Sequence, residues 1–300
     1  MKTITKDKIV YTFDKENVPV ERISSGETIR IETCDCFTDT VTSEDDLMMD
    51  LDFSKINPAT GPIYVEDAMP GDVLKVEILK IDLEPLGIMA VGEGLGLLGE
   101  HVTSAQTKLF PITNDTVDMF GLTLPLTKMI GVIGTAPAGE AVPNGTPDEH
   151  GGNMDCTIIK EGSTLYLPVG VEGALFALGD LHALMGDGEI SVSGAEAAGA
   201  VEVKISVIKD YALPTPSVLT KDFFATLSSA ETMEAASKDA SKKMIDFLVS
   251  NANLHFNEAY MLLSAAGKLA VCQVVDPLLT MRMELNREYL DTLMGKEWSK

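Results

Sequence analysis

The sequence has few positive charges and no long apolar run, and each shortage excludes a class of protein. Its 23 lysines and arginines are outnumbered by 46 acids, which gives a formal net charge of -23. Such a charge disfavours binding to nucleic-acid phosphates and to anionic lipid. No run approaches the roughly 20 apolar residues of a membrane span. We therefore expect neither a nucleic acid nor a membrane as partner.

Cysteine is also scarce, because four residues in a chain of 300 cannot form a disulfide framework. Cys34 and Cys36 are separated by one residue, which is closer than the usual spacing in zinc ribbons. The first residues, MKTITKDKIVYTFDKEN, contain no apolar core of signal-peptide length. Together these features predict a protein of the reducing cytoplasm.

What the first two thirds of the chain do have is the alternation of polar and apolar residues that is typical of β-strands. In ETIRIETCDCF, Ile29, Ile31 and Thr33 share one face, and Asp35 continues it. Extrapolation therefore places the Asp35 carboxylate on the buried side, with a solvated strand end as the other interpretation. Further strand-like stretches cover residues 61–81, 129–137, 163–171 and 200–209.

The last third changes character after the prolines of YALPTPSVLT. Residues 229–251 and 257–267 have helical patterns, with Ser229 as the expected N-cap of the first. Residues 268–285 return to a strand-like composition. We therefore predict an α+β protein that is predominantly β. Its two parts are a β-rich body over residues 1–210, which carries the site, and a helix-containing portion over residues 211–300, packed on the body.

The stretch GDLHALMGDGE places one histidine among three acids. Asp180 and His182 are two residues apart, and so are Asp187 and Glu189. In an extended chain each pair lies on one side of its strand. An imidazole and carboxylates that converge can bind a metal, transfer a proton, or satisfy each other, and the residues alone leave these roles open.

The other histidines are weaker candidates. His101 follows the glycine-rich VGEGLGLLGEH, which lacks the GK[ST] ending of a phosphate-binding loop. His150 lies in a long polar loop that ends at Asp155, and loops of this length are often functional. His255 lies at the approach to a helix, where capping or packing is the better interpretation.

Metal chemistry explains the mixture of acids and histidine better than the nucleophilic alternatives do. Zinc accepts imidazole nitrogen and carboxylate oxygen, whereas calcium prefers oxygen alone. The tight HExxH spacing is absent, so residue types rather than spacing suggest the metal. The GxSxG turn of serine hydrolases is also absent. Cys156 could act as a nucleophile, but a small buried cysteine is the commoner interpretation.

The sequence resembles the acetamidase/formamidase family in its short bacterial form. The resemblance is carried by SSGETIRIETCDCF, NPATGPIYVEDAMPGDVLKVEI, IGVIGTAP, HGGNMD, LPVGVEGALFALGDLHALMGDGE and LAVCQVVDP. It implies a jelly-roll-like β-sandwich body with a helix-containing α/β portion at the C-terminus. It also implies hydrolysis of short aliphatic amides such as formamide and acetamide, with release of ammonia.

The resemblance further implies a divalent metal near the acidic motifs, with zinc favoured and calcium as the alternative. By motif position, Asp35 of T-x-D, Asp155 of GGNMD and His182 of GDLH are the expected ligands. Glu189 of GDGE is the next candidate, and Asp180 could orient His182 as a partner of the ligating imidazole.

The sequence thus leads to a hypothesis of metal-assisted amide hydrolysis, in which the metal polarises the carbonyl and activates a water molecule. Glu189, Asp187 and Asp180 are the candidates for the acid that carries the proton to the departing nitrogen. The alternative is a divalent-cation-stabilised β-sandwich that binds a ligand or partner without amidase activity. A homodimer is the expected assembly.

Overall fold

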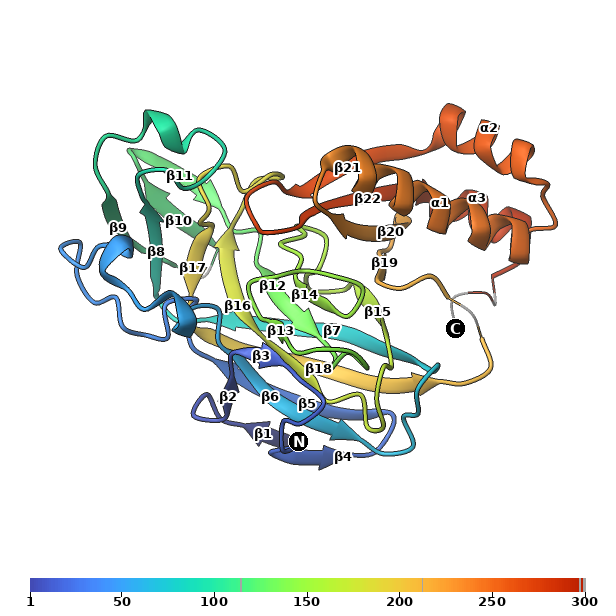
Figure 1. Cartoon of the computed structure of the whole chain (residues 1–300), viewed down its shortest axis with the longest axis horizontal. Coiled ribbons are helices and arrows are strands. Elements are labelled where there is room, and N and C mark those ends of the chain that lie inside the picture. The colour runs from blue at the N-terminus through green and yellow to red at the C-terminus, as the bar shows by residue number, and fades with distance from the viewer. Residues whose placement is uncertain (114, 212, 297, 299–300) are drawn as a thin grey trace.

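The computed structural model describes residues 1–113, 115–211, 213–296 and 298, and these fold predominantly into strands (Figure 1). Strands account for 41% of the chain and helices for 16%, which confirms the predicted α+β class with a β majority. Each of the strand-like stretches named from the sequence contains at least one strand. No helix in the described part of the chain is long and apolar enough to cross a membrane.

The first large sheet has nine strands and contains strands from both the N-terminal and the C-terminal part of the chain. In spatial order they are β1 (Lys2–Ile4), β5 (Glu27–Thr33), β18 (Gly199–Ile208), β7 (Val73–Leu83), β15 (Thr164–Pro168), β19 (Ser217–Leu219), β20 (Phe223–Ala230), β22 (Leu279–Asn286) and β21 (Lys268–Gln273). The long strand β18 pairs antiparallel with both β5 and β7 and forms the spine of this sheet.

The second large sheet also has nine strands, and it carries the histidine motif. Its main path is β14 (Gly151–Asn153), β12 (Met129–Gly134), β16 (Phe176–Leu184), β17 (Ala195–Ala197), β8 (Leu86–Val91) and β9 (Gln106–Pro111). A branch leaves β16 through β6 (Ala59–Val65) to β2 (Ile9–Val10) and β4 (Glu21–Ile23). The strand β16 therefore has neighbours on both of its edges.

Small elements complete the body. Two two-stranded sheets are the hairpin of β10 (Thr116–Met119) with β11 (Leu122–Pro125), and the pairing of the distant strands β3 (Thr12–Phe13) and β13 (Val142–Pro143). Single 3-10 turns are η1 (Met48–Asp50), η2 (Phe53–Lys55) and η3 (Gly99–His101).

The two large sheets pack face to face around one apolar core. Ile31 and Val76 contribute to it from the first sheet, and Ile133, Phe176 and Leu178 contribute from the second. Apolar side chains at every second position of a strand fall on the same face, which is why these strands can bury one face against the other sheet. The core fixes the position of β16, on which the histidine motif lies.

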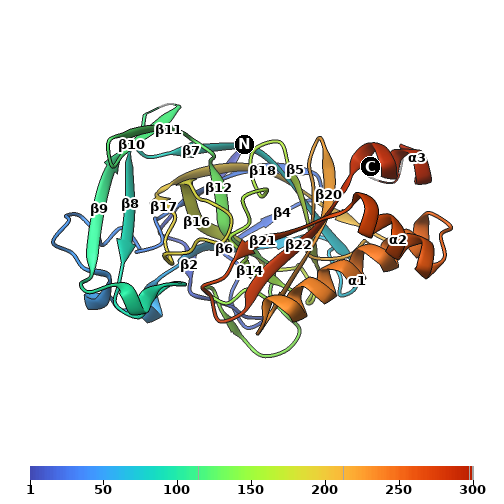
Figure 2. The same ribbon diagram turned by 90° about the horizontal axis from the view of Figure 1, so that it is seen from above.

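The C-terminal strands continue the first sheet rather than starting a separate one, since β19 pairs with β15 of the body. The helices α1 (Met233–Asn251), α2 (Phe256–Ala266) and α3 (Arg287–Met294) gather beside β20 and β22 at one end of the molecule (Figures 1 and 2). A second apolar core lies beneath them and includes Phe224, Met244 and Trp298. The proposed division of the chain at residue 210 stays a prediction.

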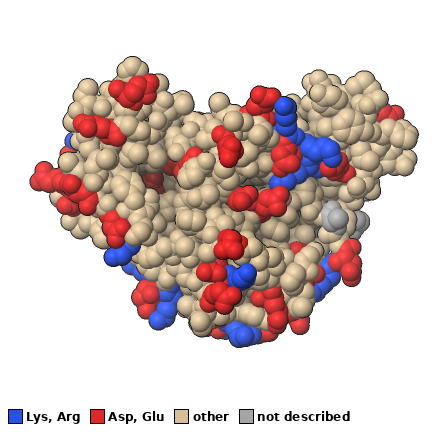
Figure 3. Space-filling view, viewed as in Figure 1, with Lys and Arg blue, Asp and Glu red and all other residues tan. Residues whose placement is uncertain are grey.

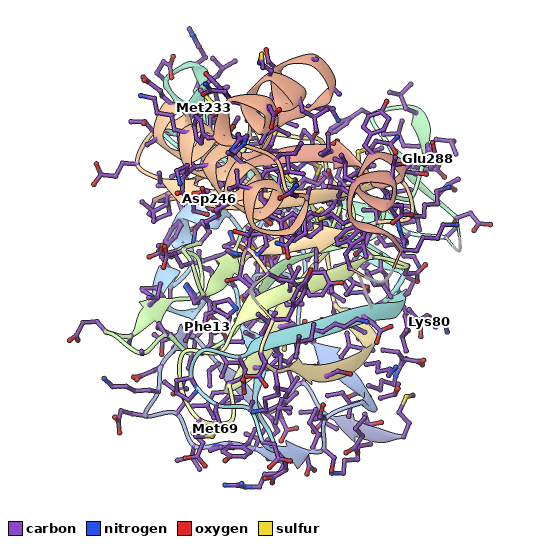
Figure 4. All side chains as sticks on the ribbon, turned by 90° about the vertical axis from the view of Figure 1, so that its right-hand side faces the viewer. Phe13, Met69, Lys80, Met233, Asp246 and Glu288 are labelled. Atoms are coloured by element: carbon purple, nitrogen blue, oxygen red, sulfur yellow. The ribbon has the colours of Figure 1, made fainter. Side chains whose placement is uncertain are left out.

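Figure 4 views the molecule from this helical end. Met233 and Asp246 of α1 and Glu288 of α3 lie on the helical layer, while Phe13 and Lys80 lie on strands of the body. Acidic side chains are spread over the face seen in Figure 3, and basic ones are fewer, as the net charge of -23 requires.

One predicted helix boundary is wrong. Ser229 lies in β20, where its hydroxyl contacts that of Thr280 at 2.9 Å, and it does not cap a helix. The helix α1 begins at Met233, and Thr232 is its N-cap because its hydroxyl accepts the backbone N–H of Ala235. The strand thus extends further than the helical pattern suggested.

Candidate active site

His182 lies on β16, and its position opposite Glu196 of β17 defines the centre of the site. The two residues are direct partners in the antiparallel pairing, so their side chains stand on the same face of the sheet. The distance from His182 Nε2 to Glu196 Oε2 is 3.0 Å. The imidazole packs against Gly194, where a Cβ atom would lie 2.6 Å from His182 Nδ1. Glycine is therefore required for the ring to occupy this place.

Asp180 reaches the same centre from two residues earlier on β16. Its Oδ1 lies 3.4 Å from His182 Nε2, although the backbone of Asp180 adopts a left-handed φ of 56° within the strand. Space for the carboxylate comes from Gly131 of the neighbouring strand β12. A Cβ atom on Gly131 would lie 2.4 Å from an oxygen of Asp180 and 2.4 Å from one of Asp155.

Asp155 arrives from the GGNMD segment, which the pairing of β14 with β12 holds beside β16. Its backbone N–H reaches the carbonyl of Gly131 at 3.5 Å, and its φ is 40°. The side chain is completely buried, and its Oδ1 lies 3.8 Å from His182 Nε2. The long polar loop and the histidine motif therefore meet in space.

The two acids of GDGE separate, although they are only two residues apart. Gly188 with a φ of 103° and Glu189 with a φ of 47° break the regular strand geometry, and Gly188 pairs with Gln273. Glu189 turns inward and is 8% exposed. Asp187 turns outward and forms a two-point ion pair with Arg282.

Many polar atoms at this centre are buried and have no hydrogen-bond partner. They are both oxygens of Asp155, both ring nitrogens of His182, Asp180 Oδ1 and Glu196 Oε2. The contacts of His182 Nε2 with Glu196 and Asp180 are ion-pair distances without hydrogen-bond geometry. Most buried polar atoms in proteins have partners, because an unpaired one costs about 1 to 3 kcal/mol. Six unpaired atoms in one place therefore point to a ligand that contacts them.

The pKa values reflect the same crowding of buried acids. Burial and the neighbouring carboxylates raise the pKa of Asp155 and of Glu189 well above their ordinary values. Burial raises the pKa of Glu196 to about 7. Burial alone would lower the pKa of His182, but the carboxylates of Glu196 and Asp180 raise it well above its ordinary value. Burial together with the crowding of the carboxylates accounts for the raised pKa values of the acids, and the carboxylates account for that of His182.

A cavity of about 660 Å³ opens onto this centre. At its polar end lie Asp180, Glu189 and Glu196, together with Asn153 and Asp276, whose side chains are hydrogen-bonded at 3.0 Å. The rest of its wall is largely apolar and includes Phe37, Met48, Phe53, Ile56, Leu95 and Val192. The cavity therefore combines an apolar wall with an acidic end.

Two sets of potential metal ligands can be distinguished among the described residues. The first, here called the histidine group, consists of Asp155, His182 and Glu189. The second, here called the cysteine group, consists of Cys36, Asp180 and Glu196. Within each group the ligand atoms lie within 4.8 Å of one another, and all six residues are buried.

Asp35 is the predicted ligand that lies outside both groups. The strand β5 ends at Thr33, and the chain then turns. Asp35 Oδ1 accepts the backbone N–H groups of Phe37 and Asp39, so this carboxylate stabilises the turn. Burial raises its pKa to about 6. Its role as a metal ligand stays a prediction, and Cys36, one residue later, is the side chain that reaches the centre.

The remaining candidates belong neither to the two ligand groups nor to the cavity lining. Cys156 is completely buried, with its Sγ 3.1 Å from that of Cys272. His150 packs edge-on against Phe13, and burial lowers its pKa to about 4. His101 is exposed, and His255 is the N-cap of α2.

Sequence reasoning missed Cys36, Glu196 and Asp276. No motif marks Glu196, since its strand GAEAAGA looks like ordinary sheet. Only the register between β16 and β17 reveals it as the partner of His182. The one-residue spacing of Cys36 from Cys34 does not suit a zinc ribbon, so the sequence gives no signal for it, although a ligand set can be completed by residues distant in sequence.

The fold and the centre together define a β-sandwich protein with a buried cluster of acids around one imidazole, at the end of a cavity. The model of the acetamidase/formamidase family matches residues 5–146 and 138–285. The chain belongs to this family.

Solved structures resemble the whole chain. The acetamidase from Bacillus halodurans is 50% identical, with a TM-score of 0.95 and coverage of 97% of this chain and 99% of that one. A predicted acetamidase/formamidase from Thermoanaerobacter tengcongensis is 43% identical, with a TM-score of 0.95 and coverage of 97% of each chain.

Curated relatives are more distant and longer. The formamidase of Methylophilus methylotrophus is 26% identical over 251 residues, which cover 64% of this chain and 62% of the relative. The matched segments span 62% to 66% of the length of the three curated relatives, so those relatives contain further sequence.

Proposed function

We propose that this protein hydrolyses short linear amides, such as formamide and acetamide, to a carboxylate and ammonia, and that it requires a divalent metal. The observation that carries the proposal is the cavity lined by the buried acids Asp180, Glu189 and Glu196, two of which contact the imidazole of His182. The names of the similar acetamidases and formamidases support the same reaction.

The donor set fits a divalent metal. Asp155, His182 and Glu189 would hold it, because imidazole nitrogen and carboxylate oxygen are ligands that zinc accepts. Both His182 nitrogens and both Asp155 oxygens are otherwise unpaired. We favour zinc over calcium, since calcium prefers sites made of oxygen alone. Such a metal supplies Lewis acidity for the amide carbonyl and lowers the pKa of water.

Proton transfer is the part of the reaction that the chain itself performs. Hydrolysis adds water to the carbonyl carbon and breaks the carbon–nitrogen bond, so one carboxylate must accept a proton from water and donate it to nitrogen. We assign this role to Asp180, because it lines the cavity and its Oδ1 has no hydrogen-bond partner. Glu189 lines the same cavity and is the second candidate.

Asp187 is less suited to this role than the other two acids. Both of its oxygens accept hydrogen bonds from Arg282, and Oδ1 also accepts one from Thr157 at 2.7 Å. The hydrogen bond and charge of Arg282 outweigh partial burial and lower its pKa. A carboxylate stabilised in its charged form is a weak base, so we expect Asp187 to hold the GDGE turn in place.

The apolar wall of the cavity has a separate function. Small amides offer little surface for binding, so selectivity depends on the fit of the cavity and on exclusion of water from the acids. Phe37, Met48 and Leu95 provide such a wall.

We also retain the expectations of a homodimer and of a reducing cytoplasm; the four cysteines are free and buried.

Ammonia release is the direct test. The purified chain is incubated with formamide, acetamide and propionamide, before and after removal of metal by a chelator, and again after Zn²⁺ or Ca²⁺ is restored. We expect turnover that is lost with the metal and recovered with Zn²⁺. A metal-containing protein that releases no ammonia from any of these amides would favour the non-enzymatic alternative, a cation-stabilised binding protein.

A further inference from the structure

The cavity that opens onto the acids is much larger than formamide or acetamide requires. Its volume is about 660 Å³. One water molecule takes up about 30 Å³ of the liquid, so acetamide, with four non-hydrogen atoms, takes up roughly 120 Å³. Cavities of about 300 to 1,000 Å³ usually hold drug-sized ligands, which have many more atoms. A small amide bound at the acids would therefore leave most of this cavity to water.

The additional space is bounded by an apolar wall that belongs to the folded core. Phe37, Met48, Leu95 and Val192 line the cavity and also pack together in one apolar cluster. Phe37 and Met48 are only 4% and 7% exposed. Because packing in the cluster holds these side chains in place, the space beside them is preformed. An apolar group that displaces water from such a wall binds favourably.

The wall begins directly beside the acids. The backbone N–H of Val192 donates to the carbonyl of Glu189 at 2.8 Å, and both residues line the cavity. Phe53, Pro143 and Pro277 also line it and are exposed, so the opening to solvent lies among them. An acyl chain attached to an amide group at the acids therefore has the apolar wall beside it.

Charge restricts the ligand further. No lysine, arginine or histidine is among the described residues that line the cavity, whereas Asp180, Glu189, Glu196 and Asp276 are. A carboxylate placed against the apolar wall would lose its hydration without gaining a cationic partner, which costs free energy. The chemistry of the lining therefore fits a neutral molecule with an apolar body.

We propose that the preferred substrates are neutral primary amides with an apolar acyl chain of about five to eight carbons, rather than formamide or acetamide. The inference rests on the proposed amide hydrolysis and specifies its substrate class. Water still adds to the carbonyl carbon and the carbon–nitrogen bond breaks, which gives the carboxylate and ammonia. Hexanamide takes up roughly 240 Å³ and therefore fits within the cavity.

Ammonia release from a series of amides tests the length of the acyl chain. The metal-loaded chain is assayed with acetamide, butyramide and hexanamide. A buried methylene group contributes about 0.8 kcal/mol, which corresponds to about fourfold in kcat/KM. The four additional methylene groups of hexanamide should therefore raise kcat/KM more than about 100-fold above that of acetamide. A kcat/KM for hexanamide equal to or below that of acetamide would overturn the inference and leave the proposed function standing.

A matched ligand tests the charge of the substrate. Adipamate has the same number of carbons as hexanamide, but its chain ends in a carboxylate. We expect its kcat/KM to be at least about tenfold below that of hexanamide, because no cation of the lining pairs with this carboxylate. Equal values for the two amides would overturn the restriction to neutral substrates.

A pair of variants tests the wall itself. Leu95→Trp places a larger side chain in the cavity and should lower the ratio of kcat/KM for hexanamide to that for acetamide by more than about tenfold. The matched control is Leu97→Trp, because Leu97 is 52% exposed and outside the lining. This control should keep the ratio of the wild type. Equal ratios in the two variants would overturn the role of the wall.

A binding measurement separates this inference from the proposed function. Ketones cannot release ammonia, and 2-heptanone carries a methyl group where hexanamide carries its amino group. Calorimetric titration of the metal-loaded chain should give a Kd for 2-heptanone more than about 100-fold below that for acetone. This difference in Kd, without ammonia release from any amide, would overturn the proposed function alone. Equal Kd values for the two ketones would overturn the inference.

Discussion

Two buried polar clusters lie on either side of the GDGE turn, and they differ in how well their atoms are paired. Around Arg282 the donors are matched, since the guanidinium binds both oxygens of Asp187, Glu284 at 2.7 Å and the carbonyl of Val271. Around His182, six polar atoms have no partner. A satisfied cluster stabilises the fold by itself, whereas an unsatisfied one needs a ligand.

The difference also explains how one short turn can serve both clusters. Asp187 ties the turn to Arg282 of β22, and Gly188 pairs with Gln273 at the end of β21. Glu189 is thereby directed into the cavity. Substitutions in the paired cluster are therefore expected mainly to lower stability. Substitutions in the unpaired cluster are expected to lower metal binding and turnover.

The largest effect on turnover is expected for His182→Ala. Loss of a residue that only orients a metal ligand costs roughly 10-fold to 100-fold, so loss of a ligand should cost more than about 100-fold in kcat/KM. Ammonia release and metal content are measured on the folded variant. The control is His101→Ala, because His101 is 75% exposed and belongs neither to the ligand groups nor to the cavity lining. Wild-type turnover and metal content in His182→Ala would remove this residue from the site.

Glu189→Gln should have the next largest effect, with turnover reduced by roughly 100-fold. The substitution keeps the size of the side chain but removes its charge, and a neutral amide is a poorer ligand for zinc. We expect metal content to fall together with turnover. Metal retained at reduced turnover would make Glu189 the proton carrier in place of Asp180. Asp187→Asn is the matched control and should leave metal content unchanged.

Arg282→Met should affect stability more than chemistry. Removal of one partner from a buried ion pair costs about 3 kcal/mol, and Arg282 is 2% exposed. Chemical denaturation measures the change in the free energy of unfolding. Metal content should fall less than in Glu189→Gln, because the pairing of Gly188 with Gln273 still holds the turn. The control is Lys268→Met, which removes a 65% exposed partner of Glu284 and should cost less than about 1 kcal/mol. Equal losses in the two variants would contradict the assigned role of Arg282.

The sequence predicts the sheets well because strand alternation is a local property. Ile29, Ile31 and Thr33 are all completely buried, as their spacing indicates. The extrapolation to Asp35 goes two residues beyond the end of β5, into a turn with different geometry. Asp35 is nevertheless buried, as the extrapolation requires. Alternation carries no information about where a strand ends, so it does not reveal that the turn brings Cys36 into a group of potential ligands, and the role of Asp35 as a ligand stays a prediction.

The remaining site residues depend on contacts between distant segments. Glu196 enters the site through the register of β17 against β16, and Asp276 enters through its hydrogen bond with Asn153. Register is set by the packing of whole sheets, and no short motif encodes it. A cluster assembled from several strands therefore becomes visible only in the folded structure.

The smallest effect on turnover is expected for Cys156→Ser, which tests the comparison at the cluster whose polar atoms are paired. The Cys156 thiol is completely buried against Cys272, and it is not among the residues that line the cavity. Burial alone would raise its pKa, but the hydrogen bond from Cys272 and the charge of Arg282 lower it. A lowered pKa favours the thiolate, which is the form that a nucleophilic mechanism requires.

Location nevertheless decides against a nucleophilic role, because a nucleophile must reach the carbonyl carbon of the substrate. We expect Cys156→Ser to keep kcat/KM within about twofold of the wild type, since water is the attacking group in the proposed reaction. Ammonia release measures this directly. Mass spectrometry of the wild type, quenched during turnover of acetamide, provides the second arm. An acetyl group attached to Cys156, together with loss of turnover in Cys156→Ser, would replace the metal-assisted mechanism with a thiol mechanism.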